Sequence, residues 1–439
     1  MFDVGKTMAI PAVKLGLIAV LILVLQIPLL MVAGQVEERQ GRQGEVEREF
    51  ERGWGPGQAV WGPVLVVPYK YVTYITNNVP NVYRGSVQVL AEQMSEDVRL
   101  ATETRHRGMF EATVYTADVS MRGEFKLPPL TLEGDRKPEF LWDEARLVFG
   151  VRSVRGLGAD VTARIDGTDQ PVEPISGGWP LSGRCSLALL AAPVRLSGPE
   201  AQTSFETRFT LRGSQSFEAS PEGRRASVSM VSAWASPSFK EGMLPGSSAL
   251  SPEGFSANWD VPGQAGSRLP VDLAAGGPNC STEAAAGVRL LPAVATYLMV
   301  SRTMKYETLF LVLAFLTYFL FETASRVRIH PMQYGLLGLS VTLFPLILVS
   351  VAEPVGFGVG YAVATAAVLA QATLFTLSVT RRRALAAWFG AILAGLFGFL
   401  YVVLSLESYA LLAGTVALFA ILSVVMAATR RVAWSGAAG

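Results

Sequence analysis

The chain has 439 residues, of which 50% are hydrophobic and only 17% are charged, and its formal net charge is +1. Soluble domains carry about 25% charged residues, so this composition and a mean hydropathy of +0.36 favour a membrane protein. The balanced charge gives no reason to expect nucleic acid as a partner. Two histidines and two cysteines are too few for a metal site rich in either residue, so no metal or cofactor is predicted.

An apolar segment from about Leu15 to Ala33 predicts the first transmembrane helix. It contains no charged residue, and its length is close to the roughly 20 residues that cross a bilayer core. A cleaved signal peptide is the alternative, but the run is too long for one and no small-residue cleavage site closes it. We therefore expect an uncleaved anchor, with residues 1–34 forming a cytoplasmic N-terminus and the first helix.

Residues 35–304 predict a large β-rich domain outside the cytoplasm. The stretch from Val36 to Arg52 is charged and helical in pattern, and the glycines from Gly53 to Gly57 break it. Short alternating segments follow, such as Phe255 to Val261. Alternation with a period of two places apolar side chains on one face of a sheet. We expect a sandwich or an open barrel, in one part or two.

Both cysteines, Cys185 and Cys280, fall in this domain. An exported pair of thiols lies in a compartment that permits oxidation, so a disulfide between them is a candidate feature. Two unpaired thiols, one buried and one on a loop, are the alternative. The sequence leaves both open.

Residues 305–431 predict a transmembrane bundle, and residues 432–439 a cytoplasmic tail. Five apolar runs are each long enough to cross a bilayer and are separated by short polar breaks. With the first helix they predict a membrane protein of six transmembrane helices, one N-terminal and five C-terminal. The five runs lie at about Tyr306–Thr323, Tyr334–Val351, Val355–Val379, Leu385–Leu404 and Tyr409–Ala428.

Lysine and arginine mark alternate ends of these helices, whereas Glu353 and Glu407 lie in the loops between them. Cytoplasmic segments of membrane proteins carry an excess of Lys and Arg. Both termini are therefore expected in the cytoplasm and the β-rich domain on the other side. The marking residues are Lys6, Lys14, Arg326, Arg328, Arg381, Arg382, Arg383, Arg430 and Arg431.

No catalytic motif is recognisable, and no enzymatic activity is predicted. His106 lies between two arginines, where a bound metal cation would be repelled, so we interpret it as an exposed residue of a strand edge. A serine nucleophile would need a base, and His106 is the one histidine of the outer domain. His330 is interpreted as a loop residue, with contact to anionic lipid headgroups as the alternative.

The bundle is expected to be poor in buried charge. Glu307 and Glu322 are placed at the two ends of the second helix, and this placement argues against ion-coupled transport. Gln371 is the strongly polar group near the middle of the fourth helix. We interpret it as the donor or acceptor of a hydrogen bond between helices rather than as a transport residue.

Several segments together resemble the CreD family of bacterial inner-membrane proteins, over nearly the whole chain. The resemblance implies a role in cell envelope integrity and envelope stress, without an assigned mechanism, ligand or catalytic residue. The segments include Gly53–Gly55, Gly62–Leu65, Arg107–Phe110, Trp142–Leu147, Leu211–Ser214, Gly254–Trp259, Phe319–Glu322, Arg328–Tyr334 and Tyr409–Leu412.

Three functions remain for such a chain. The first is a non-enzymatic protein of the bacterial inner membrane whose periplasmic β domain binds an envelope component while the helices anchor it. The second is a transporter or lipid-handling protein that uses the five-helix bundle. The third, a membrane enzyme, is disfavoured by the scarcity of histidine. Beyond the lipid bilayer, the partner is expected to be an envelope protein, a lipid or a glycan, and the oligomeric state is open.

Overall fold

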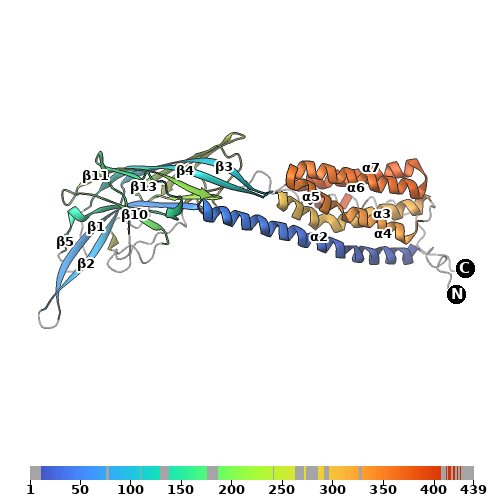
Figure 1. The fold of residues 1–439 in the computed structure, drawn as a ribbon, viewed down its shortest axis with the longest axis horizontal. Coiled ribbons are helices and arrows are strands. Elements are labelled where there is room, and N and C mark those ends of the chain that lie inside the picture. Colours follow the sequence, from blue (N-terminus) through green and yellow to red (C-terminus); the bar gives the residue numbers. More distant parts are fainter. Residues whose placement is uncertain are drawn as a thin grey trace. The chain divides into compact units, whose positions relative to one another are not determined.

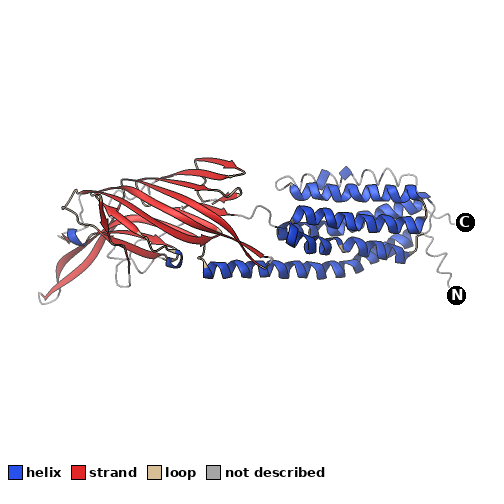
Figure 2. Ribbon diagram, turned by 45° about the horizontal axis from the view of Figure 1, so that its top comes forward, coloured by secondary structure: helices blue, strands red, loops and turns tan. Residues whose placement is uncertain are grey.

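The computed structural model describes residues 11–75, 79–108, 110–128, 138–175, 186–240, 242–262, 271–272, 285–290, 296–325 and 329–406, together with 412, 414–416, 419–420, 423 and 426. The chain divides into two compact units. One consists of Met1–Arg42 and Val294–Gly439, and the other of Gln43–Ala293. Helices make up the first unit and strands make up most of the second (Figure 2).

The first unit is a helical bundle (Figure 1). A break at Leu343 separates two of its helices, because Pro345 lies in the first turn of the second and cannot continue the hydrogen-bonding of the first. The helices are α2 (Pro11–Gly53), α3 (Thr296–Ser325), α4 (Pro331–Thr342), α5 (Phe344–Val355), α6 (Phe357–Thr380) and α7 (Arg383–Ser405).

In the described part of the chain, five helical segments are long and apolar enough to cross a membrane. They are Lys14–Gly53, Tyr297–Leu320, Pro331–Val355, Phe357–Thr380 and Arg383–Ser405. The sixth predicted helix, Tyr409–Ala428, falls mostly outside the described residues, although those described within it are helical. Five apolar helices are thus present, and a total of six remains a prediction.

The first helix packs against the others, a point that the sequence left open. Ile18, Leu25 and Val36 of α2 are buried in one hydrophobic cluster with side chains of α3 to α7. A Cβ atom at Gly338 of α4 would overlap the side chains of Leu25 and Phe315. The close approach of α2 to α4 therefore depends on a residue without a side chain.

The second unit contains two β-sheets. The ten-stranded sheet runs β14-β18-β12-β1-β6-β10-β9, with β2, β5 and β17 attached beside it, and the eight-stranded sheet runs β15-β16-β13-β3-β4-β11-β7-β8. The strands are β1 (Gln58–Ile75), β2 (Val79–Leu90), β3 (Gln93–Arg107), β4 (Phe110–Lys126), β5 (Glu139–Phe140), β6 (Arg146–Val151), β7 (Thr162–Ile165), β8 (Thr168–Gln170), β9 (Glu173–Pro174), β10 (Ala188–Pro193), β11 (Gln202–Ser214), β12 (Ser216–Ser220), β13 (Arg225–Ser232), β14 (Pro237–Phe239), β15 (Ser247–Ser251), β16 (Gly254–Pro262), β17 (Val271–Asp272) and β18 (Ala286–Leu290).

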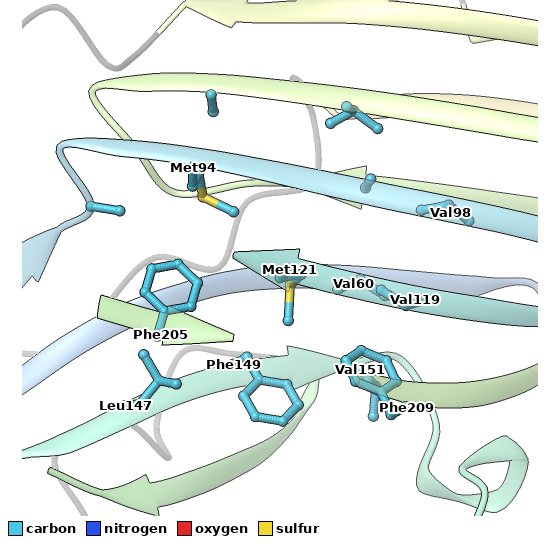
Figure 3. Close-up of a cluster of buried hydrophobic side chains, with 14 of the residues drawn as sticks. Val60, Met94, Val98, Val119, Met121, Leu147, Phe149, Val151, Phe205 and Phe209 are labelled. Carbon is cyan, nitrogen blue, oxygen red and sulfur yellow. The ribbon is translucent and has the colours of Figure 1, made fainter. Parts of the chain in front are cut away.

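Side chains of both sheets share one hydrophobic core (Figure 3). Met121 and Phe205 come from the eight-stranded sheet, and Leu147 and Phe149 come from the ten-stranded sheet. Along β11 and β13 every second residue is buried, which is the alternation that the sequence shows. Two separate sheets that pack on one core form a sandwich. The structure therefore confirms the sandwich and not the open barrel.

Candidate functional site

A carboxyl group lies in the middle of the helical unit. Helix α3 begins at Thr296, and its apolar span runs from Tyr297 to Leu320. At about 1.5 Å per residue, Glu307 lies about 15 Å along that span. The sequence-based placement of Glu307 at a helix end was wrong. Polar residues such as Lys305 interrupt the apolar run. A prediction from hydropathy alone therefore placed the start of this helix about ten residues too late.

Glu307 is fully enclosed by protein. Its side chain is 1% exposed, and neither carboxylate oxygen has a hydrogen-bond partner among the described residues. Placing an ionised carboxylate in such surroundings costs several kcal/mol even after relaxation. Ionisable residues inside membrane helices are for this reason rare and commonly functional.

The surroundings of Glu307 are mainly aromatic. Tyr361 of α6 lies close enough to interact electrostatically with the carboxyl group, and its hydroxyl donates to the Phe397 carbonyl oxygen of α7 at 2.6 Å. The Phe344 ring lies 5.3 Å from Tyr361 and 4.7 Å from Phe397 between ring centroids. Phe310, one turn beyond Glu307, lies 5.7 Å from Phe397. These rings, from four helices, form an aromatic cluster that includes Tyr361, and no described cation forms an ion pair with Glu307.

Glu322 has a different environment near the end of α3. Lys14 forms an ion pair with its Oε1 atom, and the Ile329 backbone N–H donates to the same atom at 3.1 Å. The Tyr334 hydroxyl donates to Oε2 at 2.9 Å. Both oxygens are satisfied, so Glu322 joins α2, α3 and α4 and leaves no open position for a ligand.

His330 lies in the same region and caps a helix. Its ring Nδ1 accepts a hydrogen bond from the Met332 backbone N–H at 3.2 Å. The Gln333 side chain in turn accepts from the His330 backbone N–H at 2.9 Å, which completes a capping box at the start of α4. This arrangement favours the structural interpretation of His330 over lipid contact.

Three further polar contacts join helices. Ser340 of α4 donates to Gln371 of α6 at 2.9 Å, so the predicted interhelical hydrogen bond of Gln371 is confirmed. Glu353 of α5 accepts from the Tyr297 hydroxyl at 3.0 Å and lies 3.6 Å from the Arg39 guanidinium of α2. Of the three carboxyl groups on helices α3 to α7, Glu322 and Glu353 have cationic partners and Glu307 has none among the described residues.

In the β unit, the β1–β2 hairpin forms a projecting arm (Figure 1). Pairing of β1 with β6 ends at Val66 and pairing with β5 ends at Lys70, whereas pairing with β2 continues to Ile75. Beyond Lys70 the described part of the hairpin is paired only with itself. We call residues 71–75 and 79–83 the arm.

The arm carries exposed apolar side chains on both faces. Val72 is 53% exposed and pairs across the hairpin with Val82, which is 57% exposed. Tyr74 is 67% exposed on the same face. On the other face, Tyr71 stacks on Tyr83 at 5.4 Å between ring centroids. Exposed clusters of this kind mark interaction sites.

Two of the segments that carry the family resemblance, Gly53–Gly55 and Leu211–Ser214, meet where α2 ends on the sandwich. The Trp54 indole N–H donates to the Tyr115 carbonyl oxygen at 3.1 Å. Arg105 lies 3.8 Å and Arg212 lies 4.9 Å from the Trp54 ring centroid. The Tyr115 hydroxyl packs against Gly213, where a Cβ atom would overlap it. Trp54, Arg212 and Gly213 are therefore explained by packing of this junction.

Two carboxyl groups of the β unit lie in low-dielectric surroundings. Glu96 of β3 is 1% exposed between the core residues Met121 and Val228 of the neighbouring strands. Burial raises its pKa to about 8, with a smaller contribution from the Asp97 charge. Burial also raises the pKa of Glu222 to about 7, opposed by a 2.8 Å hydrogen bond from the Trp61 indole. No sequence signal distinguished these residues from other glutamates.

The remaining residues singled out from the sequence form no site. The His106 side chain is 60% exposed and lies 3.5 Å from Glu111, beyond the stretch of β3 that pairs with β13. It is therefore an exposed residue of a locally unpaired edge, as predicted. Cys185 and Cys280 lie outside the described residues, so their pairing remains a prediction. Groups of three or more potential metal ligands are absent from the described part of the chain.

Comparison with known proteins identifies the family. The family model for the inner membrane protein CreD matches residues 11–435. The inner membrane protein CreD of Escherichia coli (strain K12) is 26% identical over 424 residues, which cover 94% of this chain and 91% of that protein.

Two solved structures show a weak likeness to parts of the chain. A Legionella pneumophila protein named for nutrient binding is 9% identical, with a TM-score of 0.26 over 58% of this chain and 80% of that chain. Native leukotriene A4 hydrolase of Saccharomyces cerevisiae is 11% identical, with a TM-score of 0.21 over 46% of this chain and 28% of that chain. TM-scores this low do not indicate a shared fold. The family model, in contrast, matches nearly the whole chain, from residue 11 to residue 435, and the chain therefore belongs to the CreD family of inner membrane proteins.

Proposed function

We propose that this protein contributes to cell envelope integrity by binding another envelope protein through the arm of its β unit. The family gives the inner-membrane setting, and the distribution of Lys and Arg favours a periplasmic β unit with both termini in the cytoplasm. The single observation that carries the binding proposal is the arm, whose apolar side chains are exposed in the described structure.

The chemistry of the arm favours a protein as its partner. Tyrosine is enriched among the residues that dominate protein–protein binding energy, and Tyr74 and Tyr83 are both well exposed. Along the arm both strands present unpaired backbone edges among the described residues, and such edges can accept an additional strand from a partner. A two-stranded hairpin is only marginally stable in water by itself, so a bound partner would also stabilise it.

The proposal is tested by making the arm polar in the full-length chain. The variant carries Val72→Ser, Tyr74→Ser and Val82→Ser. Its matched control carries Val154→Ser, Val231→Ser and Leu250→Ser, which replace equally exposed apolar residues elsewhere in the β unit. Each is expressed in a strain that lacks its own CreD-family gene, and growth is measured under detergent and β-lactam challenge at matched membrane levels.

We expect the arm variant to behave like the deletion and the control variant to restore growth. Full rescue by the arm variant would contradict binding through the arm. Equal loss in both variants would mean that general destabilisation of the β unit, rather than a specific surface, explains the effect.

The alternative function is transport or lipid handling by the bundle. The observation that favours it is Glu307, a carboxyl group enclosed at mid-span. A chain lacking residues 57–270 but keeping its apolar helices distinguishes the two functions. Rescue by this chain would support the bundle, whereas loss of rescue together with loss in the arm variant would support binding.

We also propose a non-enzymatic role. The support is the scarcity of histidine in the β unit, whose one histidine, His106, is exposed and next to a carboxylate. Incubation of the purified protein with envelope lipids and with peptidoglycan fragments tests this. Turnover of either substrate that is lost on heat inactivation would contradict the proposal.

A further inference from the structure

We propose that Glu307 is a proton-binding site of the helical bundle: its carboxyl group is protonated in the packed bundle and exchanges this proton with the solution. The inference goes beyond the proposed function. It holds whether the bundle carries a substrate or anchors the β unit.

The first support is the difference between Glu307 and the other two carboxyl groups on helices α3 to α7. Glu322 is paired with Lys14, and Glu353 lies beside Arg39. Glu307 is as well enclosed as either of them, yet no described cation pairs with it and neither oxygen accepts a hydrogen bond. A carboxylate in that position would be left with an uncompensated charge, whereas a protonated carboxyl group would not.

The second support is the set of groups that face Glu307. From α6 the titratable group is the Tyr361 hydroxyl. Tyr401 of α7 contacts Tyr361 rather than Glu307, with 5.2 Å between the two ring centroids, and is itself 42% exposed. Helix α5 contributes the ring of Phe344 to the same aromatic enclosure. Where α2 meets α3 nearby, the contact is between two neutral side chains, since Thr308 donates to Gln26 at 3.0 Å.

The third support is an available acceptor. Tyr361 uses its hydroxyl proton in the bond to the Phe397 carbonyl oxygen. The Tyr361 oxygen has two lone pairs, one of which faces the Thr365 hydroxyl, so the other can accept from a protonated carboxyl group once a small side-chain shift brings the two groups into hydrogen-bond distance. An ionised Glu307 could make no equivalent bond with that oxygen without breaking the bond to Phe397.

A metal cation fits the surroundings less well than a proton. Hard cations need about six or more oxygen ligands. Around Glu307 the described neighbours are mainly rings, and the nearby Thr303 hydroxyl donates its proton to the Met299 carbonyl oxygen at 2.9 Å. A proton requires only the carboxyl group and one acceptor.

The experiment labels the full-length protein in native membranes with dicyclohexylcarbodiimide. This apolar reagent takes the proton of a carboxylic acid onto one nitrogen, and the carboxyl oxygen adds to its central carbon. In water-free surroundings the O-acylisourea rearranges to a stable N-acylurea, whereas in water it is hydrolysed back to the acid. Peptide mass spectrometry then locates the adduct.

We expect a stable adduct on Glu307 whose yield falls as the pH rises from about 6 to about 9, because only the protonated group reacts. The Glu307→Gln variant should lose the adduct. The Glu322→Gln variant should keep it, since it alters a carboxyl group that is paired in the same bundle.

Two results would overturn the proposal. Absence of an adduct on Glu307 over this pH range would mean that the group is not a protonated acid. An adduct whose yield does not change with pH would mean that the proton is never released.

A second measurement asks whether proton release matters for function. In the growth assay, Glu307→Asp should rescue the deletion strain and Glu307→Gln should not, because only aspartate can exchange a proton. Full rescue by Glu307→Gln at normal membrane levels would show that Glu307 acts only as a polar residue of the core. It would contradict a functional proton site.

Discussion

Lys14 of α2 and Glu322 of α3 form an ion pair between residues that are 308 positions apart in the chain. Each side chain is only 14% exposed, and the lysine also donates to the Ile329 carbonyl oxygen at 2.9 Å. The pair therefore fixes the first helix to the bundle through groups that are largely removed from water. Its contribution can be measured because either partner can be removed separately.

Removal of one partner should destabilise the bundle more than removal of both. Glu322→Ala leaves the Lys14 charge partly buried without its partner, and breaking a buried pair in this way costs about 3–5 kcal/mol. The double variant with Lys14→Ala should recover part of this loss. Thermal unfolding of the detergent-purified chain provides the measurement, and additive losses would show that the two residues are not coupled.

The stability of the β unit should fall as the pH rises. The pKa of Glu96 is about 8 in the folded state and about 4.5 without burial. The stabilisation that its neutral form permits is therefore fully present below about pH 4.5 and is lost as the pH rises through about 8. At about 1.4 kcal/mol per pH unit, the full loss is of the order of 4–5 kcal/mol.

The Glu96→Gln variant should remove the part of the pH dependence that Glu96 contributes and raise stability at alkaline pH, whereas the smaller part from Glu222 should remain. Urea unfolding of the full-length protein, followed by tryptophan fluorescence, gives the pH profile. Asp97→Asn on the neighbouring position is the control. It breaks a surface ion pair with Arg122, so it should change stability by less than about 1 kcal/mol and leave the slope with pH in place.

Gly213→Ala should destabilise the junction between α2 and the sandwich. The added Cβ atom would overlap the Tyr115 hydroxyl, which donates to the Ser216 carbonyl oxygen at 2.6 Å. Overpacking of this kind costs about 1–3 kcal/mol. In Gly44→Ala the new atom meets nothing within 4 Å, and alanine favours the helix by about 0.5–1 kcal/mol, so stability should rise. Equal effects of the two substitutions on Tm would contradict the packing argument.

The Gln371–Ser340 hydrogen bond should contribute little. Double-mutant cycles on membrane helices give about 0.6 kcal/mol on average for such bonds. Gln371→Leu and Ser340→Ala should therefore each lower the Tm slightly, with a coupling energy below about 2 kcal/mol. A larger coupling energy would indicate that Gln371 holds more than this single contact.

The sequence alone located the apolar helices that the structure describes, and it also identified the β-rich character of the segment between the first of these helices and the others. These features have local signatures: run length for a helix that crosses a bilayer, and alternation for a strand with one buried face. Phe255–Val261 lies within β16 as the alternation indicated. The interhelical role of Gln371 was also predictable, because a polar group at mid-span needs a partner.

Only the tertiary structure decided the depth of Glu307, the pairing of Lys14 with Glu322 and the packing of α2 on α4. Helix α3 begins at Thr296, about ten residues before the start predicted from the sequence, and its polar residues Thr303 and Glu307 are buried by packing against other helices. The arm likewise follows from where β5 and β6 stop pairing with β1. Contacts between residues far apart in the chain leave no periodic pattern in the sequence. They can therefore be identified only from the folded structure.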